Sequence, residues 1–141
     1  MDLPLRVLVS AVVVGLTVPA VLGAWSAYET DQASVRAVQA IDAIVRAAQQ
    51  FYVAGGGAED VRVDLGGGIT ARIEYVRIGD APGGPLGPSA SYRVTGQPEV
   101  LVLSDPAVPM SGLDGPLRLG SGRHVVRITF DGQGDVRVAL A

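Results

Sequence analysis

The side chains that could support catalysis are few in this sequence. His124 is the single histidine, and the chain has no cysteine. A zinc site needs three or four His, Cys or carboxylate ligands, and a hydroxyl or thiol nucleophile needs a positioned base beside it. The lack of cysteine also excludes disulfides and thiolate chemistry. Because His124 alternates in phase with the apolar residues of its expected strand, we predict a partly buried, structural imidazole.

Two glycine-containing motifs resemble the beginning of ligand-binding loops. Gly120–Gly122 (GSG) begins like a dinucleotide-binding loop, but a β-branched strand follows where that loop needs a helix N-terminus. Asp131–Asp135 (DGQGD) begins like a calcium loop, but Val136 stands where such a loop requires glycine. Tight-turn chemistry explains this second motif better. We therefore expect no catalytic residue, no cofactor, no cofactor-binding residue and no metal site, and predict that the protein is not an enzyme.

Composition narrows the classes of partner. The 141 residues carry a net charge of −3, with arginines and acidic residues interspersed and no basic tract. A basic patch is the usual footprint of nucleic-acid binding, so we expect no nucleic-acid partner. No motif points to a small-molecule substrate. This length is typical of one domain plus an anchor.

The elements that position these residues begin with an apolar run. Residues 7–28 (VLVSAVVVGLTVPAVLGAWSAY) carry no charge, and as a helix they would reach about 30 Å, the thickness of a bilayer core. Three interpretations compete: a cleaved signal, with small residues at Gly23, Ala24 and Ser26 for a peptidase; a buried core helix; and a retained membrane helix. We favour the membrane helix, because the run exceeds the ~18 residues at which membrane spanning becomes the expectation.

The charges that flank the run predict its orientation. Arg6 precedes it, whereas Glu29 and Asp31 follow it, which under the positive-inside rule makes residues 1–6 a cytoplasmic leader and places the chain after residue 28 outside the cell. Aromatic residues near its outer end suit the headgroup layer, and mid-helix glycine and proline should kink or loosen the helix. The residues expected to act in membrane insertion or assembly are Val7, Val12, Val14, Gly15, Pro19 and Trp25.

A helical period continues without a linker through residues 29–54, an amphipathic extension of the same helix. Apolar residues recur in steps of three and four and form one stripe, which Ile44 and Phe51 widen. This stripe packs on the protein's own β-domain, on copies of itself, or on both along different edges. Gly55–Gly57 should end the helix. The packing stripe comprises Val35, Val38, Ile41, Val45, Ala48 and Tyr52.

The period changes to two at Val61, which predicts a β-domain over residues 58–141. About seven short strands with turns between them indicate an antiparallel sheet or small sandwich, and an α+β fold overall. We expect two glycine- and proline-rich surface loops, Gly79–Ser89 and Ser104–Gly115. A short strand is expected at Leu117 and Leu119. Three hairpins are also expected: Val61–Leu65 with Ile69–Tyr75, Tyr92–Val94 with Val100–Leu103, and His124–Phe130 with Val136–Leu140.

As an architecture, this order of elements resembles type IV pilin-like proteins, in particular their archaeal branch of pilins and archaellum components. The resemblance implies that residues 7–24 pack with copies as a filament core, with Gly15 and Pro19 as a flexible point, and that Val61–Leu140 forms the outer surface. Two features differ from the family. Arg6 is followed by Val7 rather than by the Gly or Ala of a prepilin cleavage site, and the glutamate that bacterial pilins place early in the helix has no counterpart.

Two functions follow as expectations. The first is a non-catalytic subunit, major or minor, of an extracellular type IV pilus-like filament, whose partners are the membrane and copies of itself or related pilin-like subunits. The second is a single-pass membrane protein whose β-domain acts as an envelope adaptor. An anchored enzyme or transport accessory is the third and weakest, because the residues for chemistry are missing.

Overall fold

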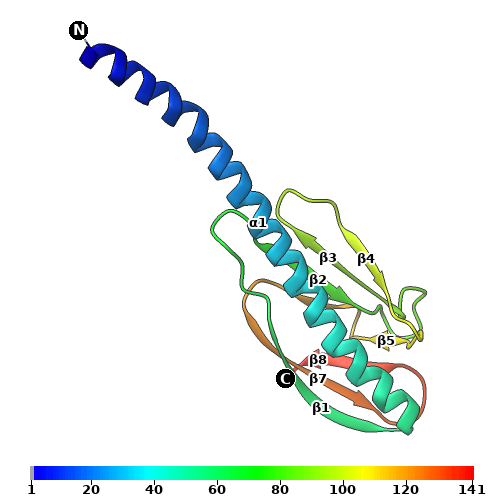
Figure 1. Ribbon diagram of the computed structural model, residues 1–141. Helices are drawn as coiled ribbons and strands as arrows, with labels where there is room; N and C mark the ends of the chain where they lie inside the picture. The colour runs from blue at the N-terminus through cyan, green and yellow to red at the C-terminus, as the bar shows by residue number, and fades with distance from the viewer. Residues whose placement is uncertain (1) are drawn as a thin grey trace.

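The computed structural model describes residues 2–141 and shows one long helix followed by eight strands (Figure 1). The strands form two sheets, in the orders β1-β7-β8-β5 and β4-β3-β2-β6. The predicted α+β class, a long helix before a largely antiparallel β-domain, is confirmed. The elements are α1 (Asp2–Ala54), β1 (Gly57–Asp64), β2 (Ile73–Ile78), β3 (Ser89–Val94), β4 (Val100–Leu103), β5 (Met110–Ser111), β6 (Leu117–Leu119), β7 (Arg123–Phe130) and β8 (Val136–Leu140).

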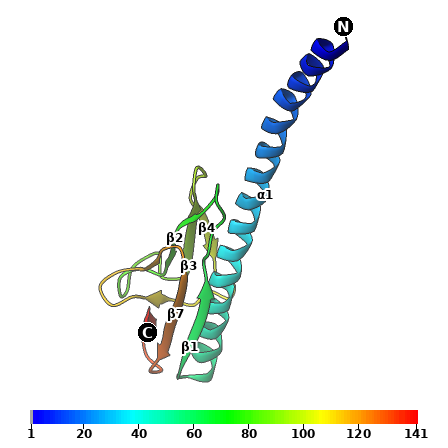
Figure 2. The same cartoon turned by 90° about the vertical axis from the view of Figure 1, so that its left-hand side faces the viewer.

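The helix α1 is continuous through Pro19 over its 53 residues. Figure 2 shows a gently curved rod without a sharp bend, so of the kink or loosening expected at Gly15 and Pro19 the kink is absent and the loosening stays a prediction. The helix ends where the sequence predicted. Gly55 adopts a left-handed conformation with φ of 80°, and the N–H of Gly56 donates to the carbonyl of Phe51 at 3.0 Å. This is the Schellman pattern, which satisfies a carbonyl that the helix end would leave without a partner.

The first predicted hairpin is wrong. β1 pairs along its whole length with β7, from Gly57 opposite Phe130 to Asp64 opposite Arg123, and β2 lies in the other sheet between β3 and β6. The connection between β1 and β2 has eight residues, far more than the two-residue loop that joins the strands of a tight hairpin. β1 instead meets a partner of equal length, and cross-strand charges fit this register, since the Arg127 guanidinium donates to both carboxylate oxygens of Asp60 at 2.8 and 3.0 Å.

The other predicted strand pairings are confirmed. β3 pairs with β4 and β7 with β8, both antiparallel, and β6 covers the short strand predicted at Leu117 and Leu119. One expected surface loop is partly internal. Met110, within the loop predicted over Ser104–Gly115, is fully buried and begins β5, which runs parallel to β8. A two-residue strand is too short to show the period that reveals longer strands.

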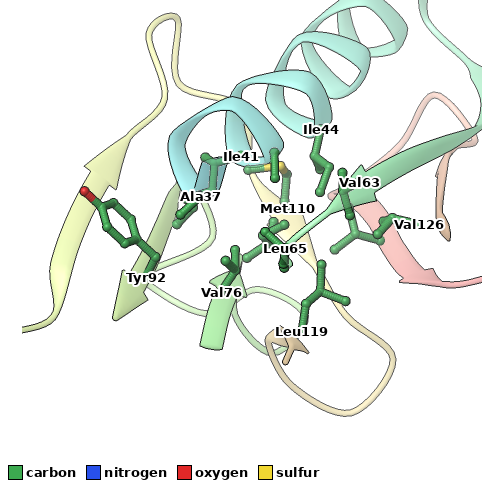
Figure 3. Close-up of a cluster of buried hydrophobic side chains, with 14 of the residues drawn as sticks. Ala37, Ile41, Ile44, Val63, Leu65, Val76, Tyr92, Met110, Leu119 and Val126 are labelled. Atoms are coloured by element: carbon green, nitrogen blue, oxygen red, sulfur yellow. The ribbon is translucent and has the colours of Figure 1, made fainter. Parts of the chain in front are cut away.

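A single hydrophobic core lies between the helix and both sheets (Figure 3). The helix supplies Ala37, Ile41 and Ile44 to it, opposite side chains from both sheets such as Val76 and Val126. The lower half of α1 is therefore an integral part of the β-domain, and its upper half extends beyond that domain (Figures 1 and 2).

Candidate functional site

The N-terminal half of α1 is a largely apolar surface without a partner among the residues that the structure describes. Every side chain from Leu3 to Trp25 is exposed, including all six residues predicted for membrane insertion or assembly. By length and composition α1 can cross a membrane, and the apolar window that qualifies it is entirely outside the core. A core helix of a soluble domain would bury this face. The free surface of residues 3–28 is the first part of the candidate site.

The junction between the free and the packed halves of the helix is built around Glu29, the first buried side chain of α1 among the described residues and only 9% exposed. Its Oε1 accepts hydrogen bonds from the Trp25 indole Nε1 at 2.8 Å and from the Ile69 N–H at 3.1 Å. Its Oε2 accepts the N–H groups of Thr70 at 2.6 Å and Ala71 at 3.1 Å, together with the Thr70 hydroxyl. We call this arrangement, formed by Glu29 and residues 68–71, the Glu29 clasp.

The glycines of the β1–β2 connection make the clasp possible. A Cβ on Gly68 would lie 2.6 Å from both Glu29 oxygens, so only glycine allows the backbone this close to the carboxylate. The Gly68 N–H donates to the Ala71 carbonyl at 2.9 Å, which closes the turn and brings three successive N–H groups together. The sequence predicted Glu29 only as a charge at the membrane boundary and residues 66–68 only as a hairpin turn. No local pattern joins residues forty positions apart.

The clasp holds Glu29 in its ionised form. Hydrogen bonds from the Thr70 hydroxyl and backbone, more than those from Ile69 and Trp25, lower the pKa of Glu29 from 4.5 to about 2, against the opposing effect of desolvation. A carboxylate that accepts several N–H and O–H bonds favours its charged state. The helix is therefore joined to the β1–β2 connection through a charged group at neutral pH.

The face that α1 presents to the sheets is offset from the predicted stripe. Of the stripe residues, Ile41 and Ala48 are buried and Val45 is half-buried, whereas Val35, Val38 and Tyr52 are more than 40% exposed. Alanine, which the stripe largely omitted, dominates the contact because its small side chain lets the helix backbone approach the sheets closely. The buried helix face comprises Ala33, Ala37, Ala40, Ile41, Ile44, Ala47 and Ala48.

A partly apolar groove remains on the packed half of α1. Val38 and Val45 line it on the helix, and Val102 and Leu103 line it on strand β4, together with the polar side chains of Asp42, Arg46, Gln49, Ser104 and Asp105. Val35 continues the apolar part of the surface one helical turn closer to Glu29. We call the five apolar residues Val35, Val38, Val45, Val102 and Leu103 the α1–β4 groove. The structure thus divides the predicted stripe into an inner part, packed on the sheets, and an outer part that faces solvent.

Polar contacts on both sides fix the helix against the domain. The Arg36 guanidinium donates to the Gly66 carbonyl at 2.6 Å, and the Gln49 amide donates to the Pro106 carbonyl at 3.1 Å. These bonds join the helix to the β1–β2 connection and to the loop after β4. With the Glu29 clasp they join α1 to the β-domain at three points.

The residues considered for chemistry have structural roles. His124 is half-buried and its Nε2 lies 2.8 Å from the Gly120 carbonyl. Asp131 accepts the Gln133 N–H at 3.1 Å, so this motif forms an Asx turn. Within residues 2–141 no three His, Cys, Asp or Glu side chains are grouped closely enough to hold a metal ion. Comparison with protein-family models, with curated proteins and with solved structures finds no match for this chain.

Proposed function

We propose that this protein is a non-catalytic structural subunit, major or minor, of an extracellular type IV pilus-like filament, which assembles through its N-terminal helix. One observation carries the proposal: an exposed helical rod, apolar and uncharged over residues 7–28, extends from a folded β-domain and is continuous with the helix that packs into the core of that domain. Such a surface needs either lipid or the same surface of other copies to cover it.

The α1–β4 groove favours copies of the chain over lipid alone. Val35 and Val38 lie six and nine residues after Glu29, which is about 9 and 13 Å along the helix axis. If Glu29 lies at the membrane surface, lipid tails do not reach these side chains. A neighbouring helix packed alongside α1 covers the free rod and the groove together, because the two surfaces are continuous along one helix.

The membrane is the place from which subunits would be assembled. In this proposal the residues after the apolar run lie outside the cell, the N-terminus is cytoplasmic, and the membrane-spanning helix is residues 7–28. Arg6 before the run and the acidic residues after it support this orientation. Partners are then the bilayer and copies of this chain or related pilin-like subunits.

A second candidate function is a permanently anchored adaptor whose β-domain binds another envelope component. Strand β4 favours it, because it lies at the end of its sheet and, within residues 2–141, pairs with a strand on one side of its backbone only. Its Leu101 and Leu103 are also well exposed. An edge strand with apolar side chains is a template for pairing with another chain.

Shearing of the cell surface separates the two functions. For a filament subunit we expect the full β-domain in the sheared, sedimentable fraction as well as in the membrane. A Val38→Arg variant should remain in the membrane but be lost from the sheared fraction, because it replaces an apolar contact side chain of the α1–β4 groove with a long charged one. Ala43→Arg, on an exposed position of the same helix that is outside this groove, is the matched control. If the protein stays wholly in the membrane fraction, a filament subunit is contradicted and the adaptor is favoured.

A further inference from the structure

Three exposed side chains gather where the free rod meets the β-domain. Trp25 and Tyr28 are on the helix, with ring centroids 6.3 Å apart, and Ile69 lies in the β1–β2 connection. The backbone N–H of Ile69 and the indole N–H of Trp25 donate to the same oxygen, Oε1 of Glu29. The Ile69 backbone is therefore held beside Trp25 at the level where the apolar run ends. We call Trp25, Tyr28 and Ile69 the exit collar.

Folding of the chain does not explain the position of Ile69. Its side chain is 86% exposed, more than any other large apolar side chain among the described residues. The neighbouring Thr70 and Ala71 are held by the Glu29 clasp, so the backbone on which Ile69 stands is fixed. The structure thus presents an isoleucine to solvent on an ordered turn.

The level of the collar along the helix points to what covers it. Trp25 is 18 residues after Val7, so as a helix the run from Val7 places it about 27 Å along the axis, at the outer limit of a hydrocarbon core near 30 Å thick. Tryptophan and tyrosine are enriched in this headgroup region. Figures 1 and 2 show the β1–β2 connection at the end of the β-domain nearest the free rod.

We propose that the exit collar is a membrane-contact surface, in which Ile69 enters the headgroup layer beside Trp25 and Tyr28. The partner is the outer leaflet of the bilayer that holds α1, and the inference rests on the proposed membrane anchoring. The β-domain then touches the membrane at two places, through its helix and through the β1–β2 connection. Such a second contact fixes the orientation of the domain on the membrane while the subunit awaits its partners.

Site-directed fluorescence tests this surface in the full chain. Because the chain has no cysteine, Ile69→Cys can carry a single environment-sensitive label. Val53→Cys is the matched control, since it replaces an exposed aliphatic residue of α1 that lies 24 residues after Glu29, about 36 Å away along the axis. Both variants are reconstituted in phosphatidylcholine vesicles that contain shallow nitroxide-labelled lipid, and iodide serves as the aqueous quencher. Trp25, the only tryptophan, reports independently on the helix.

The proposal predicts a blue-shifted emission at position 69 with strong loss of fluorescence to nitroxide lipid and little loss to iodide. Position 53 should show the reverse. If position 69 behaves like position 53 while Trp25 is quenched by the lipid, the exit collar is refuted and membrane anchoring stands. If nitroxide lipid quenches neither Trp25 nor position 69, both the collar and the anchoring are refuted. Thermal unfolding that matches the parent chain shows that each labelled variant is folded.

Discussion

The packing of α1 on the sheets yields the sharpest prediction, because it depends on which helix face is internal. Ala37 is fully buried, between Ala33 and Ile41 on the same face, and Figure 3 shows it directed toward the sheets. Ala37→Leu adds three carbon atoms at this point of close contact. The helix must then move away from the sheets, or neighbouring side chains must leave their preferred rotamers.

The size of the effect follows from the lack of space. Inserting extra methylene groups into a well-packed core costs about 1–3 kcal/mol, and we expect Ala37→Leu to lower the free energy of unfolding by that amount. In a β-domain of this size each kcal/mol lowers the melting midpoint by about 4–8 °C. Ala43→Leu, at an exposed position six residues further along α1, should change stability by less than about 0.5 kcal/mol.

Thermal and denaturant unfolding of the full chain in detergent micelles measures both variants against the parent. Val38→Ala belongs in the same series, because Val38 is prominent in the predicted stripe but is 42% exposed. The unassembled subunit should tolerate it with a loss well below that of Ala37→Leu. The packing argument is refuted if Ala43→Leu destabilises the protein as much as Ala37→Leu, or if Val38→Ala is the most damaging of the three.

Three further predictions concern the Glu29 clasp and the free rod. The folded-state pKa of Glu29 is depressed from 4.5 to about 2, so its stabilising contribution is complete above about pH 4.5 and is lost as the pH falls toward 2. Between these pH values the melting temperature of Glu29→Gln should therefore fall less steeply than that of the parent chain. An equally steep fall in the variant would contradict the assignment. Gly68→Ala should open the clasp and raise the pKa of Glu29 toward 4.5 in a carboxyl chemical-shift titration, whereas Gly115→Ala, where a Cβ meets nothing within 4 Å, should leave it unchanged. Val14→Asp places a charge in the middle of the apolar run at a cost of about 2.5–3.5 kcal/mol on insertion scales, so the fraction of protein recovered with membranes should fall, and unchanged partitioning would count against a spanning helix.

Local sequence was sufficient for the elements with a strong period and a clear stop signal. The helix end at Gly55 follows from the need for a left-handed residue after the last turn, and the β7–β8 hairpin follows from alternation on both sides of Asp131–Gly134. Charge and apolar length likewise located the free rod. In each case the physical cause lies within a few residues of the feature that it determines.

The parts that the sequence did not predict depend on contacts between distant residues. The alternation of Val61–Leu65 was recognised, but its partner β7 begins about sixty residues later, and only tertiary packing selects it over the adjacent segment. The predicted stripe included Ile41, Ile44 and Ala48 of the buried helix face. It missed the other alanines of that face because alanine carries little hydrophobic signal, yet its small size is what close helix–sheet contact requires. The Glu29 clasp was missed because a carboxylate beside a membrane helix and three glycines each have an ordinary local explanation.

Self-association through the apolar rod is the central claim, and single-cysteine crosslinking tests it most directly. In the cysteine-free chain, Val12→Cys places one reactive thiol on the exposed rod. Val53→Cys, the control, places one at the far end of the helix. Treatment of intact cells with a membrane-permeant bismaleimide should give a covalent dimer of this chain for Val12→Cys, because one thiol per chain allows each subunit a single crosslink. Only monomers, or only adducts with other proteins, from a Val12→Cys chain that is folded and present in the membrane would contradict assembly through the rod.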